Sequence, residues 1–127
     1  MEIFGMVNWL AVIVGAVVAF GVGYFWYSPM LFGKKWAEGS GVEMGTASDM
    51  PIMAMATQFL GLFLLALVIG LTAVSDALIT AIAAILATAT LTFSMGAFVK
   101  KSNYALFTDF GYIIVCGVVM IAAQGIL

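Results

Sequence analysis

Two residue types that build many catalytic and metal sites, histidine and arginine, are missing from this 127-residue chain, and cysteine occurs once. The absence of histidine removes any Ser/His pairing for nucleophilic catalysis and the commonest metal ligand. Charge is scarce too: charged residues make up 8% of the chain, hydrophobic residues 65%, and the mean hydropathy is +1.24. A soluble domain carries roughly 25% charged residues. The composition therefore indicates a small protein embedded in lipid, without the basic run that would recruit nucleic acid.

Long uncharged segments occupy most of the chain, at 3–33, 50–75, 77–99 and 110–127. A helix needs about 20 apolar residues to cross a bilayer. None of the segments alternates apolar and polar residues as the strands of a membrane barrel do. We therefore predict an all-α, integral membrane four-helix bundle in which residues 1–127 form a single transmembrane domain. The predicted spans are about 5–28, 51–71, 75–99 and 104–126.

The first apolar segment does not have the pattern of a secretory signal. Glu2 stands where such a signal carries positive charge, and the apolar segment is longer than the usual core of about 7–15 residues. We therefore expect this segment to remain as the first helix. The single cysteine, Cys116, falls in the middle of the fourth span, where we expect a small apolar filler.

The basic residues are four lysines in two places. Lys34 and Lys35 follow the first predicted span, and Lys100 and Lys101 follow the third. In a four-span chain the two corresponding loops, about 29–50 and 100–103, face the same side of the membrane. Cytoplasmic loops carry the excess of lysine, which predicts that this side is cytoplasmic and that the topology is N-out/C-out.

Boundaries between the spans are also visible in the sequence. Residues 37–49 read AEGSGVEMGTASD, a composition typical of a solvated loop. Pro29 is expected to mark the end of the first helix, because the residue before a proline avoids the α region. Side chains that can cap helices stand near the later predicted starts: Ser48 or Asp49, then Ser75 and Asp76, then Ser102 or Asn103.

The stretch YFWYSPMLFGKKW at 24–36 combines six aromatic residues with two lysines at the predicted cytoplasmic end of the first span. Rings with polar tips collect at headgroup depth, and lysines reach from there to phosphates. We interpret Trp26, Tyr27, Lys34, Lys35 and Trp36 as contacts with membrane lipids. A specific pocket for a lipid headgroup or a small ligand, built from the same rings, is the alternative.

Small residues recur every four positions in the first span, at Ala11, Gly15, Ala19 and Gly23. Helices in lipid associate through close packing of small residues rather than through a hydrophobic driving force. We predict that this stripe is a helix-packing face, either inside the bundle or against another chain. The third span has a comparable face in Ala77, Thr80, Ala81, Ala84, Thr88 and Thr92.

Polar residues within the spans are the candidates for chemistry. Asp109 stands about six residues into the fourth span, Tyr112 follows it by three, and Gln58 of the second span lies at a similar predicted depth. We interpret these three residues as a candidate polar intramembrane site that could handle a proton or a cation. The alternative is that Asp109 pairs with Lys100, Lys101 or Lys34, which reach in from the interface, or with a polar neighbour. Asn8 and Gln58 are expected to form hydrogen bonds between helices.

Two groups of residues have the character of a family motif. The first group is Asn8-Trp9, Trp26-Tyr27-Ser28-Pro29, Phe32-Gly33-Lys34 and Trp36, and the second is Asp109 with Tyr112 three residues later. In these residues, and over essentially its whole length, the chain resembles the DUF1761 family of bacterial membrane proteins. The resemblance implies a four-helix integral membrane protein of the bacterial inner membrane, and it carries no function with it.

A Gly-rich phosphate loop, metal-ligand spacing and paired carboxylates within one span are all absent from the sequence. We therefore expect a protein that is not an enzyme and that has no cofactor or metal. Short loops and few polar residues favour a non-enzymatic accessory, assembly or structural subunit of a membrane complex, with other membrane chains as partners. The alternatives are a small oligomeric transporter or permeation unit that uses Asp109, and a protein that binds a lipid or pigment.

Overall fold

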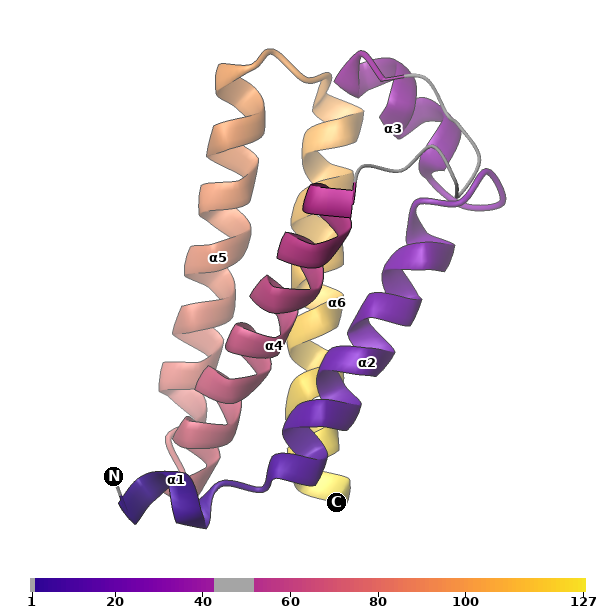
Figure 1. The fold of residues 1–127 in the computed structure, drawn as a ribbon. Helices are drawn as coiled ribbons and strands as arrows, with labels where there is room; N and C mark the ends of the chain where they lie inside the picture. Colours follow the sequence, from indigo (N-terminus) through magenta and orange to yellow (C-terminus); the bar gives the residue numbers. More distant parts are fainter. Residues whose placement is uncertain (1, 43–51) are drawn as a thin grey trace.

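The computed structural model describes residues 2–42 and 52–127. Within these ranges the chain is helical and contains no strand. Four helices are long and apolar enough to cross a membrane: α2 (Trp9–Trp26), α4 (Ile52–Val74), α5 (Leu78–Phe98) and α6 (Asn103–Ile126). Two short helices, α1 (Glu2–Met6) and α3 (Gly33–Ser40), complete the described fold (Figure 1). The predicted all-α fold with four membrane-length helices is confirmed.

The four long helices alternate in direction along the bundle (Figure 1). α6 lies at the centre of the contacts, since it packs against α2, α4 and α5 and also against α3. Both termini lie at one end, which we call the terminal end. α3 and the α5–α6 loop lie at the opposite end, which we call the lysine-bearing end because Lys34, Lys35, Lys100 and Lys101 are all there.

The centre of the bundle is filled by side chains from α2, α4 and α6. Val12, Ile69, Cys116 and Met120 are the largest side chains that are fully buried. The buried Cys116 thiol lies among apolar neighbours, as expected of a small filler. Because lipid provides no hydrophobic force between helices, the fit of these side chains holds the bundle together.

The small-residue stripe of the first span lies on the side of α2 that meets α6. Ala11, Gly15 and Ala19 are buried, and Gly23 is half-buried. A Cβ atom added to Gly15 would come within 3.4 Å of Met120 in α6. The stripe therefore allows the backbones of α2 and α6 to approach closely within one chain.

The predicted first span, 5–28, is not continuous. The chain leaves helical geometry at Val7 and Asn8, which separate α1 from α2. Asn8 does not bond between the long helices as expected; its side chain caps α2 by accepting a hydrogen bond of 3.1 Å from the backbone N–H of Ala11. The Trp9 indole donates to the Phe4 carbonyl oxygen and ties α1 to the start of α2.

Ser75 and Asp76 do not cap the third long helix. They terminate α4 instead, where the N–H of Ala77 bonds to the Thr72 carbonyl oxygen at 2.9 Å and Asp76 has a φ of 52°. This is a Schellman ending, which leaves α5 to begin at Leu78 without a side-chain cap. The last long helix does have its predicted cap, because Ser102 accepts from the N–H of Ala105. The caps predicted at Ser48 and Asp49 lie outside the described residues.

The predicted solvated loop after the first span contains a helix, α3. An eight-residue helix is not stable alone, so its contacts with the rest of the chain must hold it. The Gly39 carbonyl oxygen accepts a hydrogen bond of 2.9 Å from the N–H of Ser102, and Ala37 is buried. α3 also packs against α6. Composition alone does not predict this helix, because the contacts that hold it are with residues far away in the sequence.

Candidate functional site

Asp109 is the centre of the polar contacts at the lysine-bearing end. Its side chain is buried in the first turns of α6, with the whole residue 7% exposed. Oδ1 accepts hydrogen bonds from the Tyr27 hydroxyl at 2.6 Å and from the Trp36 indole at 2.9 Å. Oδ2 forms an ion pair with Lys101 Nζ at 2.9 Å. We call these four residues the Asp109 cluster.

The cluster joins three segments that the sequence separates. Tyr27 is the residue that follows α2, Trp36 belongs to α3, and Lys101 belongs to the α5–α6 loop. The Lys101 ammonium also lies 5.3 Å from the centre of the Trp36 ring, within range of a cation–π contact. One carboxylate therefore fixes the end of α2, the short helix and the last loop relative to one another.

The loop conformation places Lys101 beside the carboxylate. Lys100 has a φ of 62°, in the left-handed region that side chains other than glycine rarely adopt. It closes α5 with a Schellman ending in which Lys101 N–H bonds to the Gly96 carbonyl oxygen at 3.1 Å. Of the lysines considered as partners of Asp109, Lys101 is the one that forms the ion pair.

Tyr27 acts in the cluster as a neutral donor. Burial raises the pKa of its hydroxyl well above the usual value, and the negative charge of Asp109 raises it further. The phenol therefore stays protonated and keeps donating to the carboxylate across the physiological range of pH.

The aromatic rings at 24–36 divide into two groups. Tyr24 and Phe25 are exposed on the outside of α2, as rings at a membrane interface would be. Trp26, Tyr27 and Trp36 are half-buried, and each donates a hydrogen bond to α6. Trp26 donates to the Thr108 carbonyl oxygen at 3.0 Å. The polar tips of these three rings are thus satisfied by protein instead of by lipid headgroups.

Tyr112 lies one turn deeper in α6 than Asp109. Its ring packs edge-on against the ring of Tyr27, with 5.5 Å between centroids, and its hydroxyl donates to the Ala19 carbonyl oxygen at 2.8 Å. Gly23 provides the space for this hydroxyl, because a Cβ atom there would lie 2.6 Å from it. The Gln58 side chain lies near the same hydroxyl. Gln58 is itself exposed on α4 and is not among the hydrogen-bond partners of Asp109 in the described ranges.

The turn between α2 and α3 requires glycine at position 33. The Gly33 N–H bonds to the Ser28 carbonyl oxygen at 2.9 Å, and the Phe32 N–H bonds to the Trp26 carbonyl oxygen at 3.2 Å. A Cβ atom on Gly33 would overlap the Tyr27 carbonyl oxygen. This tight turn reverses the chain so that Tyr27 and Trp36 reach the same carboxylate oxygen.

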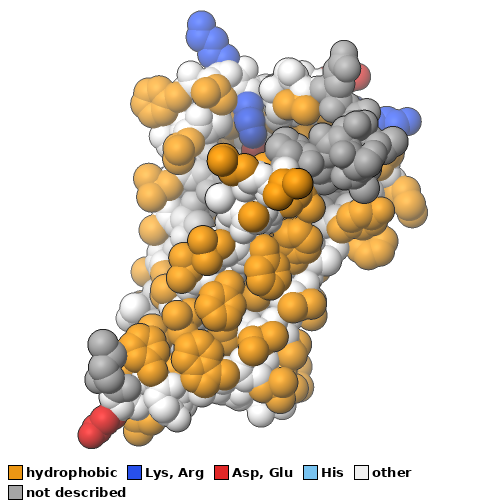
Figure 2. Space-filling view, viewed as in Figure 1, with side chains coloured by type: hydrophobic (Ala, Val, Ile, Leu, Met, Phe, Trp, Pro, Cys, Tyr) orange, Lys and Arg blue, Asp and Glu red, His pale blue; other side chains and the backbone are white. Residues whose placement is uncertain are grey.

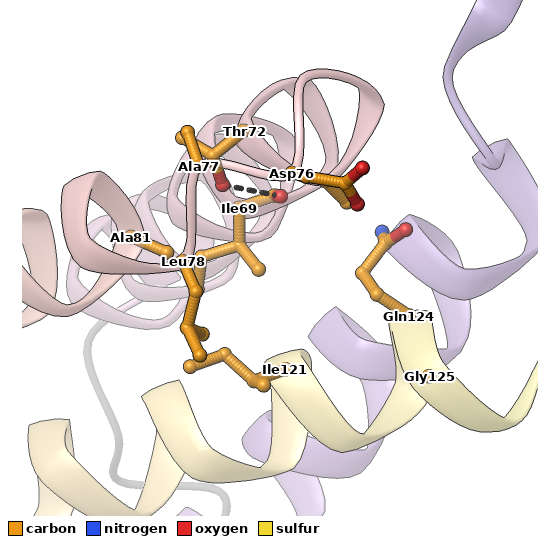
Figure 3. A pocket seen from close by; sticks show the side chains of 10 residues that line it. Ile69, Thr72, Asp76, Ala77, Leu78, Ala81, Ile121, Gln124 and Gly125 are labelled. Carbon is orange, nitrogen blue, oxygen red and sulfur yellow. Dashed lines mark hydrogen bonds between the residues drawn. The ribbon is translucent and has the colours of Figure 1, made fainter.

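Two depressions mark the surface at opposite ends of the bundle. At the terminal end, a depression of about 290 Å³ lies between the α4–α5 turn and α6. Figure 3 shows Asp76 and Gln124 facing one another at its edge, above an apolar floor that includes Ile69 and Ile121. At the lysine-bearing end, a groove of about 420 Å³ is lined by Trp26, Phe32, Asn103, Tyr104, Phe107 and Thr108. We call it the aromatic groove.

Comparison with known proteins adds one result. The model of DUF1761, a family described as proteins of unknown function, matches residues 10–125, which is nearly the whole chain. This chain belongs to the DUF1761 family. The resemblance inferred from the motifs is therefore confirmed, and the match includes every residue of the Asp109 cluster. A search of the curated proteins and of the solved structures found no match.

The structure brings part of the first motif group together with the second group, while Asn8 and Trp9 of the first group lie at the terminal end. Trp26, Tyr27 and Trp36 of the first group bond to Thr108 and Asp109 at the start of α6. The roles of Tyr27 and Trp36 as donors to Asp109 did not follow from the residues alone. The available signal was that both groups appear in the same family resemblance while lying far apart in the sequence.

Proposed function

We propose that this DUF1761 protein is a non-enzymatic accessory or structural subunit of a membrane complex and that α5 is the helix that docks onto the partner. A row of small side chains on the outer side of α5 carries the proposal. The row has alternating spacings of three and four residues and consists of Thr80, Ala83, Ala87, Thr90, Ser94 and Ala97. Ser94 is half-buried and the other five are exposed.

The spacing and the size of these residues both favour a partner helix. A repeat of three and four residues keeps one face of a helix in line along a left-handed helix pair. Small side chains on that face let a second backbone come close, and hydroxyls can bond across the contact. The outer side of α2 exposes large apolar residues suited to lipid: Leu10, Ile13, Val17 and Val18. α5 exposes such residues too, including Ile79, Leu86 and Leu91, but it presents the small row beside them.

The contacts of α5 within the chain leave this row available. α5 packs closely against α6 and less extensively against α4. The residues it buries are on another side of the helix: Ala81, Ile85, Ala89 and Gly96. A helix held along one side, with a second small face uncovered, is suited to bridging its own bundle and a neighbouring chain.

The bonding of Asp109 supports a structural role over transport. A carboxylate that carries protons or cations must exchange its partners during each cycle. Here three donors from three segments occupy both oxygens of Asp109. Releasing the carboxylate would break the bonds that join the end of α2, α3 and the α5–α6 loop to α6, so its geometry is better suited to holding the fold than to passing an ion.

We further propose that the protein lies in the bacterial inner membrane with both termini outside. The support is that the four lysines belong to α3 and the α5–α6 loop at one end of the bundle, while Glu2 begins α1 at the other end. Figure 2 shows the visible Lys side chains, in blue, at the first of these ends. Cytoplasmic ends carry the excess of lysine. The lysine-bearing end would then face the cytoplasm.

The test is purification of the tagged protein from its native membranes at natural abundance, in mild detergent, with mass spectrometry of the intact assembly and its subunits. We expect stoichiometric recovery with a larger assembly. Ala87→Leu, on the small row of α5, should release the partner. Ala122→Leu adds the same atoms to an exposed position of α6 and should leave the assembly intact.

Two outcomes would overturn the proposal. Recovery of the wild-type protein alone, as a monomer or as a small homo-oligomer, would exclude a subunit role and redirect attention to transport or ligand binding. Equal recovery of the assembly with Ala87→Leu and with Ala122→Leu would show that α5 is not the docking helix.

A further inference from the structure

The aromatic groove lies at the level where the membrane-spanning part of the bundle ends. One wall is the first turns of α6, which contribute Asn103, Tyr104 and Phe107. The other wall comes from the end of α2 and the turn that follows it, through Trp26 and Phe32. The Trp26 and Phe32 rings lie 4.7 Å apart, centre to centre. Most of the lining is therefore carbon, and it lies at the ends of two apolar spans, where we expect lipid headgroups and the upper part of acyl chains.

A positive charge is held beside this apolar lining. The ammonium of Lys35 lies 5.4 Å from the centre of the Tyr104 ring, within cation–π distance. Tyr104 is itself part of the groove wall. Lys35 is exposed, so its charge stays available to a ligand that enters the groove from the membrane.

We propose that the aromatic groove binds one anionic phospholipid, with an acyl chain against the rings and the phosphate on Lys35. The lining residues include no acidic side chain, so the groove itself has nothing to attract the ammonium of a zwitterionic headgroup. The nearest carboxylate in α6, Asp109, is already bonded to Tyr27, Trp36 and Lys101. The exposed amide of Asn103 can donate a further hydrogen bond to the phosphate or to an ester oxygen.

A phospholipid explains the combination of features better than a soluble anion. A soluble anion would need only the charge and would leave the apolar lining of the groove, including the exposed Phe107 ring, uncovered. A phospholipid uses both parts, because its chain covers the rings and its phosphate meets the ammonium. The groove also opens where phospholipids are the surrounding solvent.

The experiment measures lipid retention by the whole chain in detergent, using native mass spectrometry after titration with phosphatidylglycerol or phosphatidylcholine. We expect one phosphatidylglycerol to be retained in preference to phosphatidylcholine. Lys35→Gln should weaken this binding about fivefold. Lys100→Gln removes the same charge from the same end of the bundle, outside the groove, and should leave the binding unchanged.

A second measurement tests where the chain lies. In the Trp9→Phe protein the remaining tryptophans, Trp26 and Trp36, both lie at the lysine-bearing end. Phosphatidylglycerol with brominated acyl chains should quench part of their fluorescence, and Lys35→Gln should reduce the quenching at the same lipid concentration. Equal retention of the two lipids would overturn the proposal, and so would equal weakening by Lys35→Gln and Lys100→Gln, which would indicate diffuse attraction to the surface. Displacement of the lipid by millimolar glycerol phosphate, without quenching, would instead assign the charge to a soluble anion.

Discussion

The Tyr27 hydroxyl donates a hydrogen bond of 2.6 Å to the Asp109 carboxylate, and the two residues are 82 positions apart in the sequence. The same carboxylate oxygen accepts from Trp36. The end of the first long helix and the short helix after it are therefore held by a single group on the last helix. Loss of that group should affect all three segments together.

Removal of the Asp109 carboxylate is the first test of this arrangement. Asp109→Ala is expected to lower the free energy of unfolding by about 3 kcal/mol, because two donors and one ammonium lose a buried acceptor. Asp109→Asn keeps an oxygen acceptor and should cost about half as much. Denaturant unfolding in detergent measures both values. Equal, small effects of the two substitutions would contradict a structural role for the carboxylate.

Trp36→Phe tests the docking of α3. The substitution keeps the ring but removes the N–H that bonds to Asp109 at 2.9 Å. We expect hydrogen exchange at residues 33–40 to become at least about tenfold faster, since a bond to a charged group contributes about 1.5–3 kcal/mol. Exchange in the middle of α2 should not change. Tyr24→Phe removes a polar tip from an exposed ring and serves as the control, for which no change is expected.

Gly33→Ala should be among the most damaging single substitutions in the protein. The added methyl group would overlap the Tyr27 carbonyl oxygen, which belongs to backbone and cannot move without opening the turn. We expect a loss of about 3 kcal/mol or more, together with faster exchange in α3. Gly21→Ala is the matched control, because a Cβ atom there meets nothing within 4 Å. That change should be neutral or stabilise α2 by about 0.5–1 kcal/mol.

The contact between Gly23 and Tyr112 predicts a coupled pair of substitutions. Gly23→Ala places a methyl group 2.6 Å from the Tyr112 hydroxyl and should cost about 1–3 kcal/mol. Tyr112→Phe alone should cost about 1 kcal/mol, through loss of the bond to the Ala19 carbonyl oxygen. In the double variant the hydroxyl is gone. Its loss of stability should therefore be smaller than the sum of the two single losses by at least about 0.5 kcal/mol. Strict additivity would show that the hydroxyl is not what occupies the space at Gly23.

The long apolar segments made the all-α fold and the four membrane-length helices predictable, because the thickness of a bilayer sets the length of a spanning helix. The cap at Ser102 was predictable for a similar reason, since it depends only on neighbours in the sequence. Ser75 and Asp76 were misassigned because a short polar turn can end one helix or begin the next. The choice depends on backbone geometry at Asp76, which composition does not reveal.

The Asp109 cluster could be predicted only in part. Pairing with a lysine was one of the alternatives from the sequence, and Lys101 lies eight positions from Asp109. The donors Tyr27 and Trp36 lie 82 and 73 positions away, beyond the reach of any local pattern. Their residue types were also ambiguous. A ring with a polar tip is equally suited to a lipid headgroup and to a buried carboxylate, so the three-dimensional contacts alone distinguish the two.

The separation of Tyr27 and Trp36 from Asp109 also has a consequence in time. Synthesis proceeds from the N-terminus at roughly 5–20 residues per second, so both donors leave the ribosome several seconds before their acceptor. During that interval Tyr27 and Trp36 lack the carboxylate to which they donate hydrogen bonds in the folded protein. Arrival of the last helix then completes every link of the cluster at once. A chain whose synthesis stops before residue 109 therefore lacks every link of the Asp109 cluster, although α2 and α4 can already pack against each other.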